Sequence, residues 1–176
     1  MILNIKKLLF FIFVSFYISI STSLDVKANI IEDYGLISIM YHRFGESKYP
    51  STNIGVKEFK KHLEMIEKEG IKFIDPRNFE AELKNVNERK ILITIDDGFA
   101  SFYENAWPIL REKQIPFILF VSTREVGKFN YMNWSQIKEI DDSKIGLIGN
   151  HSHTHEYLID LTPLEIKQDL AQSMDI

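Results

Sequence analysis

The stretch Ile91-Leu92-Ile93-Thr94-Ile95-Asp96-Asp97-Gly98 decides the fold of this chain. A short apolar run of this kind is typical of a buried strand, and the two carboxylates followed by glycine mark its end. Successive residues of an extended strand point to opposite faces, so Asp96 and Asp97 can share one site only if the chain bends there. Gly98 supplies backbone freedom for that bend. We therefore expect both carboxylates to face one cavity at the carboxyl end of the strand.

A second polar segment, Asn150-His151-Ser152-His153-Thr154-His155, follows another short apolar run at residues 145–148. Four extended steps span roughly 13 Å, which is too far for His151 and His155 to reach one ion with bonds of about 2.1 Å. The two histidines must therefore lie on a helical or looped turn if both bind a metal. We expect His153, between them, either to support the site or to face solvent rather than to act as a third ligand.

These two segments resemble the first two motifs of the polysaccharide deacetylase (NodB-homology) carbohydrate esterases. Thr94-Ile95-Asp96-Asp97-Gly98 is similar to Thr-Phe-Asp-Asp-Gly, with Ile95 in place of the aromatic, and residues 151–155 are similar to His-Ser/Thr-x-x-His. The resemblance covers roughly residue 36 to the C-terminus. It implies that Asp96 is the catalytic base and that Asp97, His151 and His155 bind a divalent metal, with Zn²⁺ as the first choice.

The family's activity is metal-dependent removal of N-acetyl groups from an acetylated amino-sugar polysaccharide, and the resemblance implies this activity and this partner. Further family motifs, an Arg-containing segment, an Asp-Trp segment and a Leu-x-His, are missing from the sequence. We therefore expect residues 29–176 to be a C-terminally incomplete deacetylase domain with low activity by itself. Two alternatives stay open: a catalytically impaired, truncated glycan-binding product, and a metal-dependent phosphoesterase, which could also use Asp and His ligands.

The N-terminus has the pattern of a secretory signal peptide. A basic start that includes Lys6 and Lys7 precedes an apolar run from Leu8 to Ile20, and Val26-Lys27-Ala28 offers a cleavage site. We expect residues 1–28 to be removed and the chain to be exported to the periplasm, the cell envelope or the extracellular space. The alternative is an uncleaved membrane anchor, which would make this segment the contact with a membrane.

The charge distribution limits the possible partners, and the cysteine content limits the possible cross-links. The chain has 21 Lys and Arg against 25 Asp and Glu, with a net charge of -4, and the lysines alternate with glutamates instead of forming a basic block. This distribution argues against a nucleic-acid partner. The absence of cysteine excludes disulfides within the chain, so packing must stabilise it.

Alternation of strand-like and helix-like segments predicts an α/β fold with a parallel sheet. By resemblance it is a partial irregular (β/α) barrel of the polysaccharide deacetylase type. The chemistry of such sheets lies at the carboxyl ends of the strands, where Tyr41-His42-Arg43 could also line the site or be a packed tyrosine and a surface arginine. The expected strands are 36–41, 71–74, 91–95, 117–121 and 145–148, and the expected helices are 56–69, 76–83, 101–114, 134–140 and one that begins after Thr162.

Overall fold

The structure is a computed structural model that describes residues 34–175. The expected signal peptide, residues 1–28, lies outside the described residues. Across residues 34–175, no helix combines the length and apolar character that crossing a bilayer requires.

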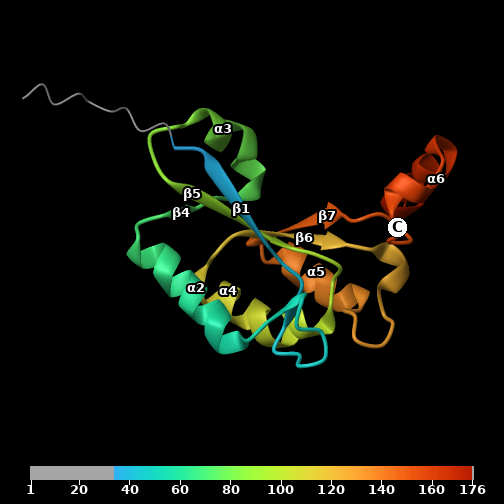
Figure 1. The fold of residues 1–176 in the computed structure, drawn as a ribbon, viewed down its shortest axis with the longest axis horizontal. Coiled ribbons are helices and arrows are strands. Elements are labelled where there is room, and N and C mark those ends of the chain that lie inside the picture. Colours follow the sequence, from blue (N-terminus) through green and yellow to red (C-terminus); the bar gives the residue numbers. More distant parts are fainter. Residues whose placement is uncertain (1–33, 176) are drawn as a thin grey trace, which may run out of the picture. The chain divides into compact units, whose positions relative to one another are not determined.

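A parallel sheet forms the centre of the described part of the chain (Figure 1). Its five strands are β1 (Leu36–Tyr41), β4 (Lys72–Phe73), β5 (Lys90–Ile95), β6 (Phe117–Val121) and β7 (Gly146–Asn150). The full length of β5 pairs with β1, whereas its first residues also pair with β4 and its last residues with β6. Strand β7 continues the sheet beyond β6. The predicted α/β fold with a parallel sheet is therefore confirmed.

A second, much smaller sheet was not predicted from the sequence. Strands β2 (Arg43–Phe44) and β3 (Asn53–Ile54) pair in parallel directly after β1. Two residues per strand are too few to produce a periodic pattern, so no sequence signal marks this pair.

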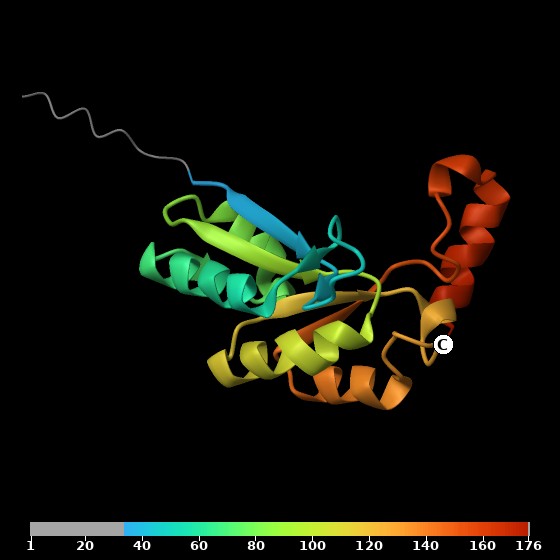
Figure 2. The ribbon, with the colours of Figure 1, turned by 60° about the horizontal axis from the view of Figure 1, so that its bottom comes forward.

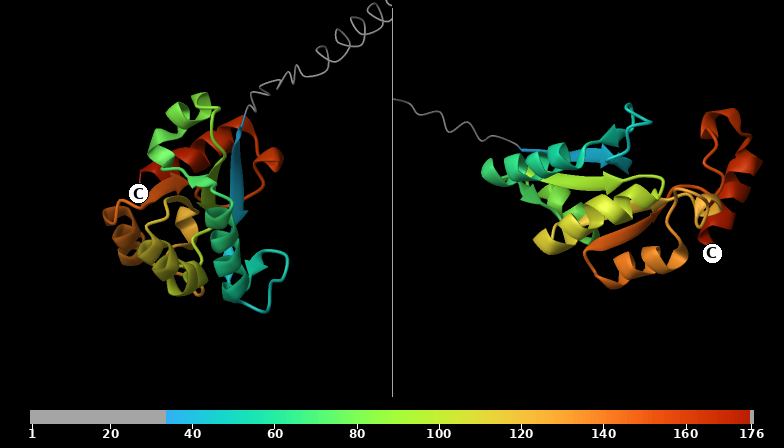
Figure 3. Two further views of the ribbon diagram at one scale, coloured as in Figure 1. Left: turned by 90° about the vertical axis from the view of Figure 1, so that its left-hand side faces the viewer. Right: turned by 90° about the horizontal axis from the view of Figure 1, so that it is seen from below.

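Helices cover one face of the sheet. Figures 1 and 2 show α2 (Val56–Lys68), α4 (Trp107–Lys113) and α5 (Trp134–Asp142) along that face. The short helix α3 (Phe79–Lys84) precedes β5, and α6 (Pro163–Met174) follows β7. Figure 3 shows α6 beyond the end of β7.

Two of the predicted helices are interrupted at their first turns. Residues 76–83 begin with the 3-10 helix η1 (Pro76–Asn78), and residues 101–114 begin with the π-helix η2 (Phe102–Ala106) before α4 starts. Pro108 lies in the first turn of α4, where its ring cannot donate a hydrogen bond and crowds the carbonyl four residues earlier. The wider π turn avoids that clash.

The core lies between the sheet and the helices α2, α4 and α5. Alternate residues of the strands, such as Ile93, Ile95 and Leu119, are buried there with Phe59 and Trp107. Burial of each such side chain contributes about 1.5–3 kcal/mol. A glycine permits the close contact of α5 with β7, because a Cβ at Gly146 would collide with the side chains of Ile140 and Phe117.

The opposite face of the sheet lines a hollow of about 700 Å³. Met40 of β1, Leu92 and Thr94 of β5 and Phe120 of β6 line it, and Asp96 and His151 lie at its end. Met40 is 60% exposed. The hollow therefore gives an accessible, largely apolar approach to the polar residues at the strand ends.

Candidate metal centre

The polar segments predicted from the sequence meet at one edge of the sheet. Asp96 and Asp97 follow β5, and His151 follows β7, so both segments lie at the carboxyl ends of parallel strands. The strand hydrogen bonding continues one residue past each strand, from Asp96 N to the carbonyl of Tyr41 at 2.8 Å and from His151 N to the carbonyl of Val121 at 3.1 Å. The sheet thus fixes the backbone from which each segment leaves.

The chain bends at these positions through left-handed backbone. Asp97 has φ +74° and Gly98 has φ +77°, while Ser152 and His155 have φ +64° and +58°. The chain after β5 therefore already bends at Asp97, one residue before Gly98. A left-handed residue other than glycine costs on the order of 1–3 kcal/mol, a strain that is common at functional sites.

The two bends bring Asp97, His151 and His155 together. The Nε2 atoms of His151 and His155 lie 3.1 and 3.0 Å from Oδ1 of Asp97, and one candidate ligand atom from each residue lies within 4.8 Å of the other two. Ligand atoms around tetrahedral zinc are roughly 3.3 Å apart, given bonds of about 2.0–2.1 Å. The looped turn that the spacing of the histidines required is present.

These atoms lie at ion-pair distance, but no well-oriented hydrogen bond joins them. Oδ1 of Asp97 is buried and has no hydrogen-bond partner among the described residues, although both imidazole nitrogens are close to it. Buried polar atoms almost always have a partner. One carboxylate oxygen and two imidazole nitrogens form a suitable donor set for a divalent cation such as zinc, so these residues fit a metal.

Asp97 and His151 shift each other's pKa in opposite directions. Burial alone would raise the pKa of Asp97, but the adjacent histidines, His151 first, overcome this effect and lower the pKa. The carboxylate of Asp97 in turn raises the pKa of His151 against the opposing effect of burial. Asp97 is therefore ionised at neutral pH, as a metal ligand must be.

Asp96 has a different environment from that of its neighbour. The residue is 8% exposed, and Oδ1 has no hydrogen-bond partner within residues 34–175. Burial, assisted by the charge of Asp97, raises the pKa of Asp96 despite the opposing charges of His151 and His42. Asp96 is thus a carboxylate of increased basicity beside the candidate metal site.

The other residues considered at the strand ends have mixed roles. Nδ1 of His153 lies 2.8 Å from Oγ1 of Thr123, outside the three-residue cluster. Tyr41 is packed and its hydroxyl lies 3.0 Å from Nδ1 of His62. Arg43 is half-buried, and its guanidinium carbon lies over the Phe99 ring, 3.3 Å from the ring centre.

Sequence reasoning missed the residues that support the histidine loop. Asp169 of α6 accepts hydrogen bonds from the backbone of His153 and Thr154. Asn150 accepts one from the backbone of Ser152, whose hydroxyl accepts one from His155 N. The aspartate lies 14 residues beyond His155 in a separate helix, so no local motif identifies it.

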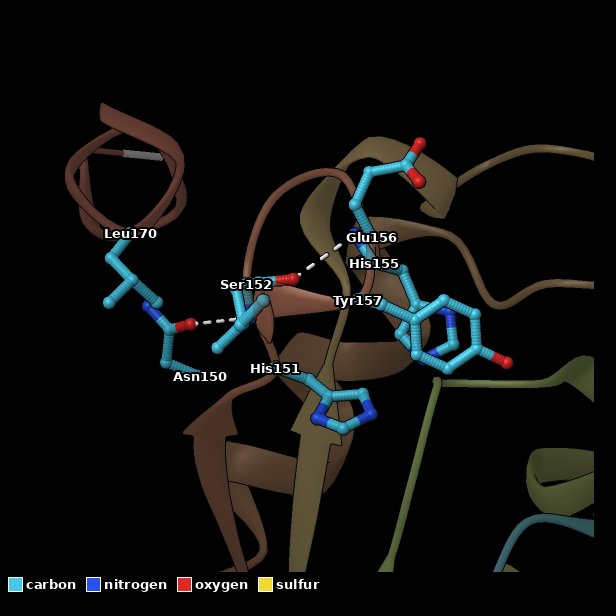
Figure 4. Close-up of a pocket in the computed structure, with 8 residues that line it drawn as sticks. Asn150, His151, Ser152, His155, Glu156, Tyr157 and Leu170 are labelled. Atoms are coloured by element: carbon cyan, nitrogen blue, oxygen red, sulfur yellow. Dashed lines mark hydrogen bonds between the residues drawn. The ribbon is translucent and has the colours of Figure 1, made fainter. Parts of the chain in front are cut away.

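A pocket of about 560 Å³ opens beside the two histidines (Figure 4). Its wall includes His151, His155, Glu156, Tyr157 and Leu170. Tyr157 is 79% exposed. An aromatic ring is therefore available to a ligand next to the candidate ligand residues.

The described residues thus form an α/β fold with a candidate metal centre at the carboxyl ends of its strands. A comparison with protein families identifies the class of protein. The family model for polysaccharide deacetylase matches residues 83–176, which include both segments of the site. The chain belongs to the polysaccharide deacetylase family.

Relatives of known name agree with this assignment. A Bacillus subtilis protein named as a polysaccharide deacetylase, YxkH, is 28% identical over 138 residues, which cover 77% of this chain and 48% of the relative. The poly-beta-1,6-N-acetyl-D-glucosamine N-deacetylase of Staphylococcus aureus is 27% identical over 135 residues, covering 74% of this chain and 45% of the relative. The chain spans about half the length of these curated relatives.

Solved structures confirm the partial barrel fold. IcaB from Ammonifex degensii superimposes with a TM-score of 0.72 at 29% identity, over 80% of this chain and 66% of the IcaB chain. A polysaccharide deacetylase from Bacillus cereus has a TM-score of 0.69 at 22% identity, over 80% of this chain and 45% of that chain. The latter similarity concerns the fold alone.

Proposed function

We propose that this protein is a metal-dependent hydrolase that removes N-acetyl groups from an acetylated amino-sugar polysaccharide. The observation that carries the proposal is the convergence of Asp97, His151 and His155 around a buried carboxylate oxygen, with Asp96 beside it. Family membership supports the proposal independently.

Asp97, His151 and His155 would hold the metal, for which we propose Zn²⁺. When bound, a divalent metal lowers the pKa of water and polarises a carbonyl oxygen. Three protein ligands leave coordination positions open, which is typical of catalytic zinc and not of structural zinc. Because Asp97 is held ionised, it contributes a negative charge to the donor set.

Asp96 would act as the general base. Its buried Oδ1 lacks a partner among residues 34–175 and is available to accept a proton from water. The raised pKa of Asp96 increases its affinity for that proton, since a base works best when its pKa approaches the working pH. Its neighbour Asp97, with a lowered pKa, stays ionised, so the two adjacent carboxylates divide the two roles.

The substrate class that we propose is an N-acetylglucosamine polymer. One relative supports this choice by its similarity, the S. aureus deacetylase named for poly-beta-1,6-N-acetyl-D-glucosamine. The apolar hollow before Asp96 and the exposed ring of Tyr157 beside His155 offer surfaces on which the apolar faces of sugar rings can pack.

Acetate release from β-1,6-linked N-acetylglucosamine oligomers tests the proposal. Because this chain is expected to be slow by itself, acetate is measured over long incubations against a sample without protein. The Zn²⁺-loaded chain should release acetate slowly, a chelator should stop the release, and Asp96→Asn should abolish it. Hydrolysis of a phosphodiester without acetate release would favour the phosphoesterase. A phosphoesterase with two metals would need a second set of ligands. The described residues contain one cluster of possible metal ligands. Oligomer binding with no turnover at all would favour the glycan-binding alternative.

We also propose that the protein is exported, with cleavage after Ala28. The support is the basic and then apolar pattern of the N-terminal residues. N-terminal sequencing of exported material should begin at Asn29, and recovery of intact Met1 in the membrane fraction would indicate an anchor instead.

A further inference from the structure

We infer that Asp169 of α6 is a positioning residue for the metal centre, which it supports by fixing the backbone between the two histidine ligands. This inference rests on the metal centre of the proposed function. It assigns a role to a residue that neither of the two sequence motifs contains.

Asp169 contacts the backbone amides of His153 and Thr154 and also the Thr154 side chain. Oδ2 accepts a hydrogen bond from His153 N at 2.9 Å, and Oδ1 accepts one from Thr154 N at 2.8 Å and one from the Thr154 hydroxyl at 2.6 Å. The side chain of Asp169 is 6% exposed. Hydrogen bonds to an ionised carboxylate are stronger than those between neutral groups, so this contact holds the loop firmly.

A second contact from the same helix face reaches the start of the loop. Ser173 lies one turn after Asp169, and its hydroxyl accepts a hydrogen bond from the side-chain amide of Asn150 at 2.6 Å. The oxygen of the same amide accepts one from Ser152 N at 2.7 Å. Asp169 and Ser173 are the buried residues of α6, so this helix presents a polar face to the segments on both sides of His151.

The loop has a conformation that needs such support. Ser152 and His155 both have left-handed backbone, with φ +64° and +58°. Non-glycine residues keep this conformation only where the surrounding structure imposes it. The two amides that Asp169 holds, those of His153 and Thr154, lie between these two positions and therefore limit the directions that the imidazoles of His151 and His155 can take.

The helix itself does not require Asp169. Its first turn is closed by a capping box, in which Thr162 and Glu165 satisfy each other's backbone amides. Asp169 lies in the interior of α6, where a side chain of this type has no capping function. Its burial against the loop is therefore explained by the loop and not by the helix.

The experiment measures the Zn²⁺ affinity of the full chain by competition with a chromophoric chelator. Asp169→Asn keeps the shape of the side chain but turns an NH₂ group toward one of the donors, so we expect about 10- to 100-fold weaker binding. Asp160→Asn, which removes the same charge at an exposed position outside α6, should bind like the wild type. The absorption spectrum of the Co²⁺ form should also change in Asp169→Asn, because the ligand geometry changes.

Three results separate the possible outcomes. Folded Asp169→Asn with wild-type Zn²⁺ affinity and an unaltered Co²⁺ spectrum would overturn the inference and leave the proposed function intact. A wild-type chain that binds no Zn²⁺ would contradict the proposed function itself. If Asp169→Asn does not fold, Thr154→Val decides: it removes one hydrogen bond to Asp169, should fold, and should bind Zn²⁺ more weakly, whereas wild-type affinity in this variant would overturn the inference.

Discussion

At the scale of single residues, two adjacent carboxylates differ because the chain turns between them. Asp96 continues the strand hydrogen bonding with Tyr41. Asp97 has left-handed backbone, which turns its side chain to the two histidines. Burial raises the pKa of Asp96, whereas the imidazoles lower that of Asp97. This difference in environment fits the two roles that we propose, a base at Asp96 and a metal ligand at Asp97.

The first prediction separates these two roles by substitution. Asp96→Asn should retain stoichiometric Zn²⁺ after dialysis, because the residue is a base and not a ligand. Asp97→Asn should lose the metal, since the amide lacks the charge of the buried oxygen. Elemental analysis of both folded variants makes the comparison, and metal retention in Asp97→Asn together with loss in Asp96→Asn would reverse the assignment.

A second prediction concerns the acid stability that Asp169 provides. Burial opposes ionisation of Asp169, but hydrogen bonds from Thr154 and His153 outweigh it and lower its pKa below the reference value of about 3.9. The ionised form therefore stabilises the fold above about pH 4, and this contribution is lost as the pH falls through the folded-state pKa. Urea unfolding should give wild type a larger free energy of unfolding than Asp169→Asn at pH 7 and a smaller advantage at pH 3. An advantage that does not change with pH would contradict this.

At the scale of elements, the sequence predicted the strands well because their apolar runs are short, continuous and bounded by turn residues. It predicted the first turns of two helices less well. The π turn before Pro108 arises from a clash within the helix, and the pair of β2 and β3 arises from tertiary contacts. The candidate ligand residues could be predicted from the two motifs that resemble those of the family, whereas Asp169 could not, because its partners lie in another element and depend on how α6 docks.

A third prediction tests the packing of α5 on β7. Gly146→Ala places a methyl group where the side chains of Ile140 and Phe117 leave no room, so it should lower the free energy of unfolding by about 1–3 kcal/mol. Gly35→Ala is the control, because nothing lies within 4 Å of its Cβ position and its φ is not positive. Equal stability of the two variants would show that α5 and β7 are less tightly packed than described here.

At the scale of the whole molecule, the described sheet has one face covered by α2, α4 and α5, whereas on the other face the short helix α3 borders the accessible hollow before Asp96. Parallel sheets are normally covered on both faces. The family comparison places the two motif segments in the matched region, and the sequence contains neither an Asp-Trp segment nor a Leu-x-His. The described residues thus contain the candidate metal centre and the proposed base, and the other catalytic groups stay unassigned.

A fourth prediction follows for the rate of the polypeptide of residues 1–176. General acid catalysis is worth about 10²- to 10⁴-fold, and an oxyanion donor is worth roughly 10²- to 10³-fold. The two factors multiply, so acetate release by this polypeptide should be at least about 10⁴-fold slower than that of the S. aureus deacetylase assayed under the same conditions. If the two proteins release acetate at equal rates and Asp96→Asn loses the activity, other residues of this chain must supply the general acid and the oxyanion donor.

The central claim is that Asp97, His151 and His155 hold one divalent metal. Anomalous diffraction at the zinc absorption edge, from crystals of the Zn²⁺-loaded chain, tests it most directly. We expect one strong anomalous peak, about 2.0–2.2 Å from an oxygen of Asp97 and about 2.0–2.1 Å from Nε2 of both histidines. No peak at these three residues in fully Zn²⁺-loaded crystals, or a peak coordinated by a different set of side chains, would contradict the account.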